Sequence, residues 1–331
     1  MTANVLRRLL VLLAGAVLLA ACGSERAGPR GSDGSTTTSG RSRELDVEVA
    51  SYDLAVGPPA RFIAGTLVPD EKTGDPRLVA FGTVRMEFSF LGTGQAAPTN
   101  SLRLPAVDAQ FLSLPGTTPP SPPPASPQVA SGEVGRGVYA AMVGFPAAGF
   151  WQVDVTANVD GRERRGNGRF QVGDKHAVPA PGDAAVSTDN PTLSSSGVPK
   201  AAIDSRAATG DIPDPELHRT SIAAALAAHR PAVVVFATPV YCQSRFCGPV
   251  TDMVQQLARD YADRASFVHV EIYRDFQAQQ LNQAVTDWHL ENEPWVFVIG
   301  ADGKIAARFD NVATRDEIEP LLKALPVIGP A

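Results

Sequence analysis

The sequence predicts a multidomain protein in which an all-β domain is followed by an α/β domain. Two patterns carry this prediction. Over residues 44–173, apolar and polar residues alternate in short segments that turn residues separate. Over 217–331, continuous apolar runs typical of buried strands are followed by segments whose apolar residues recur with the period of a helix. A chain of 331 residues can hold two domains with linkers. The net charge of −6, without a basic cluster beyond residue 43, argues against nucleic acid as a partner.

Residues 1–22 have the pattern of a signal peptide. Two arginines precede the apolar run 9–21, which is too short to span a bilayer. The run ends in Leu-Ala-Ala-Cys-Gly at 19–23, which resembles the lipobox of bacterial lipoproteins. That resemblance implies that Cys22 is lipidated and becomes the mature N-terminus. The protein would then be held by its lipid on the outer face of the cell membrane, where disulfides can form.

Residues 23–43 are rich in Ser, Thr, Gly and Arg and offer almost nothing to bury. This composition predicts a disordered tether between the lipid and the folded domains. With Cys22 assigned to the lipid, two thiols remain, Cys242 and Cys247.

The segment 44–173 is predicted to be a β-sandwich. Residues 84–90 alternate without a break, and 151–156 do the same; 61–68, 137–144 and 169–172 are weaker candidates. The stretch 148–153 is similar to the corner strand of immunoglobulin-like domains, which implies an immunoglobulin-like sandwich. The proline-rich stretch 114–130 reads as a surface insertion without a strand. No catalytic constellation is evident here, so a binding or spacer role is expected.

Residues 174–216 form a second, Pro-rich linker. Its prolines lie among small polar residues, and large apolar residues are too few for a core of its own. We expect it to run along a domain surface.

The elements of the last segment, 217–331, follow from its periodicity. A short helix over 220–229, capped by Thr220 or Ser221, precedes a fully apolar strand at 232–236. A helix begins at Cys247, a strand covers 267–272, and a helix is expected over 275–289. A hairpin of 295–299 and 304–309 follows, and then a terminal helix with capping-box spacing at 314–317 that contains Pro320.

The candidate site is the loop and helix start that follow the apolar strand. Open α/β sheets keep their sites at the carboxyl ends of their strands. Cys247 opens the helix, where free backbone amides and the helix dipole favour a thiolate, and Arg245 adds a positive charge that tunes it. Cys242 lies in the loop just before.

Phe-Cys-Gly-Pro at 246–249, after a buried strand, resembles the active-site turn of thioredoxin-like proteins. The likeness covers 217–325 and includes the family's cis-proline, matched here by Pro294. It implies a thioredoxin-like fold, with Cys247, Cys242 and Pro294 as catalytic residues. Tyr241 and Phe246 are expected to be exposed enough to contact a partner. The chain departs from the family in having C-x4-C, since Val250 occupies the usual place of the second cysteine.

Three functions remain open for this pair. In the leading hypothesis, Cys247 attacks the disulfides of extracytoplasmic proteins and Cys242 resolves the mixed disulfide, with no cofactor or metal. In the second, the pair is a permanent disulfide that pins the loop of a non-enzymatic scaffold. In the third, two thiolates carry Cu(I), as in the thioredoxin-like copper chaperones. Those proteins have C-x3-C and a histidine near the place of Glu293 or Pro294.

Overall fold

The computed structural model describes residues 44–94, 102–130 and 134–329. They belong to a single compact unit. The predicted signal peptide and tether, with Cys22, lie outside the described residues. Within the described ranges, no helix is both long enough and apolar enough to cross a membrane. Strand residues outnumber helical residues in the described chain.

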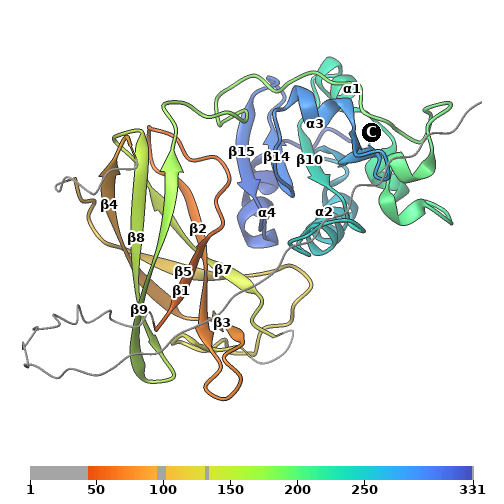
Figure 1. Cartoon of the computed structure of the whole chain (residues 1–331). Helices are drawn as coiled ribbons and strands as arrows, with labels where there is room; N and C mark the ends of the chain where they lie inside the picture. The colour runs from red at the N-terminus through yellow and green to blue at the C-terminus, as the bar shows by residue number, and fades with distance from the viewer. Residues whose placement is uncertain (1–43, 95–101, 131–133, 330–331) are drawn as a thin grey trace, which may run out of the picture. The chain divides into compact units, whose positions relative to one another are not determined.

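The N-terminal part is one continuous antiparallel sheet of nine strands (Figure 1). Eight of them follow the order β6-β3-β2-β7-β5-β4-β8-β9, and β1 pairs with β2. The strands are β1 Asp46–Val49, β2 Ala60–Pro69, β3 Pro76–Ala80, β4 Thr83–Gly92, β5 Val107–Ser113, β6 Gln128–Val129, β7 Gly137–Val143, β8 Gly149–Val159 and β9 Arg162–Val172.

Alternation along β4 gives this sheet its core. Val84, Met86 and Phe88 are buried, whereas Arg85 and Glu87 between them are exposed. This confirms the predicted strand at 84–90. Three of the other four predicted strands lie within observed ones, and 137–144 exceeds β7 by one residue. The buried core is mainly aliphatic, but its largest side chains are aromatic: Phe62, Tyr139, Phe145, Trp151 and Phe88. Burial of such residues dominates the stability of a sheet domain.

The sequence prediction differs from this sheet in two respects. The strands join in one sheet rather than two, and the sheet folds back on itself, because β1 pairs with β2 and also packs against β9. Gly166 permits that approach, since a Cβ there would collide with the backbone oxygen of Leu45. Three short strands, β1, β3 and β5, were not predicted, and the expected insertion 114–130 contributes the two-residue strand β6.

The C-terminal part is a four-stranded sheet with helices on both faces. The order is β11-β10-β14-β15, and the members are β10 Ala232–Ala237, β11 Ser266–Glu271, β14 Trp295–Ile299 and β15 Ile305–Asp310. β10 and β11 are parallel, and the other two pairings are antiparallel. The helices are α1 Ile222–Ala227, α2 Cys247–Tyr261, α3 Gln283–Asp287 and α4 Arg315–Ala324 (Figure 1).

Strand β10 shows why this part has three layers. Val233 and Val235 pack into one cluster with α2 and α4. Val234 and Phe236 pack into another with α1 and α3. A strand covered on both faces has no polar side, which explains its continuous apolar run.

The predicted N-terminal caps are confirmed at α1 and α4, whereas α1 ends two residues before the expected His229. The Ser221 side chain accepts a hydrogen bond from the backbone of Ala224 at 3.2 Å. Thr314 and Glu317 form a reciprocal capping box at the start of α4. Pro320 lies inside α4, which continues past it to Ala324.

The helix predicted over 275–289 is wrong for its first half. That stretch holds the end of β12 (Tyr273–Asp275), a turn and β13 (Gln280–Leu281), and only α3 is helical. Gln279 has a φ of 52°, which a right-handed helix cannot accommodate. Leu281, expected on the inner side, is 42% exposed.

The linker 174–216 is fixed to the α/β part. It contains the short 3₁₀ helices η1 Lys200–Ala202 and η2 Ser205–Ala207, and the four-residue η3 Pro215–His218 begins at its end. The backbone of Ser205 donates to the carboxylate of Glu271, at the end of β11, at 2.8 Å. Val178 enters the core beside α1. As expected, the linker builds no core of its own, but it buries polar side chains against the sheet.

Candidate functional site at the Cys242–Cys247 turn

The two cysteines lie between the carboxyl end of β10 and the start of α2. Cys242 belongs to the loop and donates its backbone N–H to the Thr238 carbonyl at 3.0 Å. Cys247 is the first residue of α2, as predicted. The two side chains form a disulfide, and their Cα atoms are 6.0 Å apart. The sulfurs therefore point toward each other, as thiol chemistry and a structural staple both require.

The two sulfurs differ in accessibility. Cys247 is 0% exposed and packs among Val250, Val254 and other apolar residues beneath α2. Cys242 is only partly buried. The sequence-based hypothesis gave the attack to Cys247. A partner protein would instead meet the sulfur of Cys242 first, because the helix packs its own first side chain against the sheet.

Two donors surround the sulfur of Cys242. The backbone N–H of Cys247 donates to it at 3.4 Å, and the hydroxyl of Ser244 lies 3.3 Å away. In the disulfide the sulfur has no proton, so the Ser244 hydroxyl is the donor. The N-cap residue Phe246 makes no side-chain cap, and the first amide of α2 donates to the sulfur instead. Both donors would stabilise negative charge on Cys242 after reduction.

The Glu293–Pro294 peptide lies at the same place. It is cis, as the thioredoxin-like resemblance implies, and Pro294 is buried with its carbonyl bonded to the backbone of Asn311. A carboxylate oxygen of Glu293 and the two cysteine sulfurs all lie within 4.8 Å of one another. The site therefore consists of a disulfide, a helix N-terminus and a carboxyl group.

The carboxyl group of Glu293 is biased toward its protonated form. Its burial, and then the negative charge of Glu271, raise its pKa above the ordinary value. The Tyr52 hydroxyl donates to the backbone carbonyl of Glu293 at 3.0 Å and fixes the peptide. A carboxyl group of this kind can give a proton to a leaving thiolate or take one from a thiol.

The other predicted site residues border the turn. Arg245 is exposed and has a φ of 62°, uncommon for a residue with a side chain. Tyr241 is partly buried and stacks on Phe276 with ring centroids 3.8 Å apart. Phe246 is partly buried against a cluster that includes Ile63 and Val312. The aromatic side chains are thus less accessible than the sequence suggested.

Glu293 is the residue that sequence reasoning missed. Its position directly before Pro294 is the one signal that could have found it, because a residue bordering the expected proline must lie near the cysteines. The short distance from Glu293 to the two sulfurs also makes the pair a poorer site for copper. Two thiolates suit Cu(I), but a carboxylate is a hard ligand that this soft ion does not favour.

No protein-family model, curated protein or solved structure matches this chain. What the site can do is therefore inferred from the chemistry and geometry of its residues.

Proposed function

We propose that this protein is a membrane-anchored extracytoplasmic lipoprotein that exchanges disulfides with protein partners through Cys242 and Cys247. The observation that carries the proposal is the environment of the Cys242 sulfur. It is partly accessible, it accepts the first amide of α2, and it lies beside the Glu293 carboxyl. Reactive cysteines lie in environments of this kind, at helix N-termini and within reach of a partner.

The exchange can be written from the disulfide state. A partner thiolate attacks Sγ of Cys242, a new S–S bond forms, and the Cys242–Cys247 bond breaks with its electron pair on Cys247. Glu293 supplies the proton that neutralises the leaving thiolate. A second partner thiol then attacks the partner sulfur of the mixed disulfide and releases Cys242. The partner loses two electrons and the protein becomes a dithiol, and the reverse sequence oxidises the protein again.

The proposal also assigns the two domains and the location of the protein. The C-terminal part would be a thioredoxin-like domain, which the central sheet with helices on both faces and the cis-Pro294 peptide support. The N-terminal part would be an immunoglobulin-like module that spaces the site from the membrane or binds a ligand. Lipidation of Cys22 would hold the protein on the outer face of the cell membrane.

A second candidate function is a non-enzymatic scaffold with a structural disulfide. The complete burial of Cys247 favours it, because a sulfur beneath a helix is slow to exchange. Such a disulfide closes a short loop and stabilises it by about 2 kcal/mol in the chain-entropy model. Cu(I) transport is a minor third candidate. If reduced protein fails to hold Cu(I) against a competing chelator, it is excluded.

Trapping of mixed disulfides tests the exchange function. In the Cys247→Ser variant the accessible Cys242 keeps its thiol but has no resolving partner. We expect this variant to form covalent complexes with extracytoplasmic proteins, separable by non-reducing electrophoresis, and Cys242→Ser to form far fewer. The double Ser variant is the control. If neither single variant traps more than the double variant, the exchange function is wrong and the scaffold function stands.

A further inference from the structure

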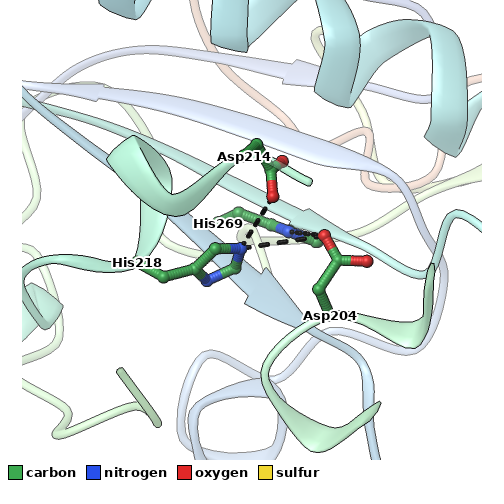
Figure 2. A group of neighbouring side chains, drawn as sticks. All are labelled: Asp204, Asp214, His218 and His269. Atoms are coloured by element: carbon green, nitrogen blue, oxygen red, sulfur yellow. Dashed lines mark hydrogen bonds and ion pairs between the residues drawn. The ribbon is translucent and has the colours of Figure 1, made fainter. Parts of the chain in front are cut away.

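A second polar cluster contains neither cysteine (Figure 2). It consists of Asp204 and Asp214 from the linker, His218 at the end of η3, and His269 from β11. All four are buried, with at most 1% of each residue exposed. Since carboxylates are almost never fully buried without partners of opposite charge, this cluster requires an explanation.

The donor atoms converge on one point. Nε2 of His218 lies 3.1 Å from an oxygen of Asp214 and 3.7 Å from an oxygen of Asp204. Nδ1 of His269 lies 3.5 Å from the same Asp204 oxygen. Tetrahedral zinc has ligands at about 2.0–2.2 Å, which places neighbouring donor atoms roughly 3.3–3.6 Å apart. The three measured separations bracket that range.

The ring of His269 gives a second observation that points to a cation ligand. Its Nε2 is 3.1 Å from the backbone oxygen of Ala237, and a carbonyl can only accept, so Nε2 carries the proton. In the neutral ring Nδ1 then presents a lone pair to the Asp204 carboxylate. This nitrogen is completely buried and has no hydrogen-bond partner. A lone pair facing a carboxylate oxygen is repulsive unless a cation, either a proton on Nδ1 or a metal ion, lies between them.

The surroundings suit a metal ion. Arg206 donates at 2.6 Å to the Asp214 oxygen that does not face His218. It also donates at 2.6 Å to Oδ2 of Asp204, the oxygen that faces both histidines, and so fixes the orientation of both carboxylates. Two carboxylates and one guanidinium leave a formal charge of −1 with neutral histidines. The bond from His269 to Ala237 is the kind of outer hydrogen bond that orients metal-binding histidines.

We propose that Asp204, Asp214, His218 and His269 form a structural site for a divalent transition metal, with zinc as the best fit. Two imidazole nitrogens favour zinc over magnesium or calcium, which prefer oxygen ligands. Four protein ligands complete a tetrahedral shell and leave no open position, which marks a structural rather than catalytic site. The metal would tie the linker to β11. The proposal does not depend on the disulfide-exchange function.

Metal analysis of the full chain, kept oxidised so that the cysteines do not compete, tests this site. After exposure to Zn²⁺ and removal of unbound metal, we expect one zinc per chain, and Co²⁺ should give the visible absorption bands of tetrahedral coordination. His269→Gln should lower the affinity for zinc at least 100-fold, whereas the matched control His289→Gln, at an exposed histidine, should bind as the wild type does.

If the His269→Gln variant fails to fold, the effect of zinc on the stability of the wild-type chain still tests the site. Zn²⁺ at 100 times its dissociation constant should raise the folded-to-unfolded ratio of the chelator-treated protein about 100-fold. A wild-type chain that neither retains zinc nor gains stability from it would overturn the proposal and identify the cluster as a proton-linked network. Equal zinc affinity in the wild type and in a folded His269→Gln variant would do the same.

Discussion

The backbone N–H of Cys247 points at the sulfur of Cys242, 3.4 Å away. The first turn of α2 thus buries one sulfur and directs its free amide to the other. The two members of the disulfide are therefore unequal: Cys247 is enclosed by apolar side chains, whereas Cys242 is partly accessible beside polar donors. Each prediction about the thiol site follows from this asymmetry.

Removing the hydroxyl of Ser244 should weaken the reactivity of Cys242. In the reduced protein this hydroxyl can donate to the thiolate, and a hydrogen bond to a charged group is worth about 1.5–3 kcal/mol. We expect Ser244→Ala to slow alkylation of Cys242 by about tenfold at neutral pH and to leave the rate at high pH nearly unchanged. The exposed neighbour variant Gln243→Ala is the control. Equal rates at neutral pH would show that the hydroxyl does not act on the sulfur.

Replacing Glu293 should change how disulfide reduction depends on pH. Burial and the charge of Glu271 raise the pKa of Glu293, so it donates protons at a pH where an ordinary glutamate has lost them. The hydroxyls of Tyr52 and Tyr273 also face this region. The reduction rate should fall as pH rises through this raised pKa. Glu293→Gln should abolish that inflection and slow the reaction by about 100-fold.

The matched control for this experiment is Glu291→Gln, two residues away and exposed. Stopped-flow measurement of reduction by a small dithiol, from pH 4 to 9, gives both profiles. A Glu293→Gln profile that matches the wild type in shape and rate would contradict the proton-donor role.

Asp53 should make the protein sensitive to acid. Burial opposes its ionisation, but the hydrogen bond with His176 and the charge of Arg308 more than compensate and hold its pKa well below the ordinary value. Its carboxylate also accepts from the backbone of Ala177 and Val178. A carboxyl group with a lowered folded pKa contributes stability above its unfolded pKa of about 4, and that stability is lost as pH falls further.

Asp53→Asn should therefore cost about 2–3 kcal/mol of unfolding free energy at pH 7 and reduce the loss of stability between about pH 4 and 2. Urea unfolding at several pH values measures both effects. Asp108→Asn, at an exposed position of β5, serves as the control. The assignment is refuted if both variants unfold at the same urea concentration throughout.

The capping box of α4 should be worth a measurable part of the stability. Thr314 and Glu317 satisfy backbone N–H groups that the helix would otherwise leave free. Thr314→Ala should lower the free energy of unfolding by about 1 kcal/mol, while Thr314→Ser, which keeps the hydroxyl, should lose much less. Identical losses in both variants would mean that the threonine methyl, not the cap, accounts for the effect.

The sequence predicted correctly those features that depend only on residues close together in the chain. The alternation of 84–90 became the buried and exposed sides of β4, and the Thr314–Glu317 spacing became the observed cap. The first half of the helix expected over 275–289 was wrong, because Leu281 is turned to solvent and Gln279 adopts a left-handed conformation. Local bonds hold this turn: the Asp275 carboxylate accepts from the backbone of Ala278, and the backbone of Gln279 donates to Phe276. Hydrophobic periodicity does not record such side-chain and turn bonds.

The same distinction between local and long-range features applies to the candidate site. The cysteine pair and the helix start at Cys247 follow from neighbouring residues, and both are present. The approach of Glu293 to the sulfurs joins segments about 50 residues apart in the sequence. The exposure of Cys242 relative to Cys247 depends on how α2 packs against β10 and β14. For the first, the sequence offers only the place of Glu293 directly before Pro294, and for the second it offers no signal.

The reduction potential of the Cys242–Cys247 disulfide, measured by equilibration of the full chain in glutathione or dithiothreitol buffers, tests the proposed exchange function most directly. If the pair exchanges electrons with partner proteins, its potential should lie between about −120 and −270 mV, the range of catalytic disulfides. A value below about −300 mV would contradict disulfide exchange and identify the bond as a structural staple.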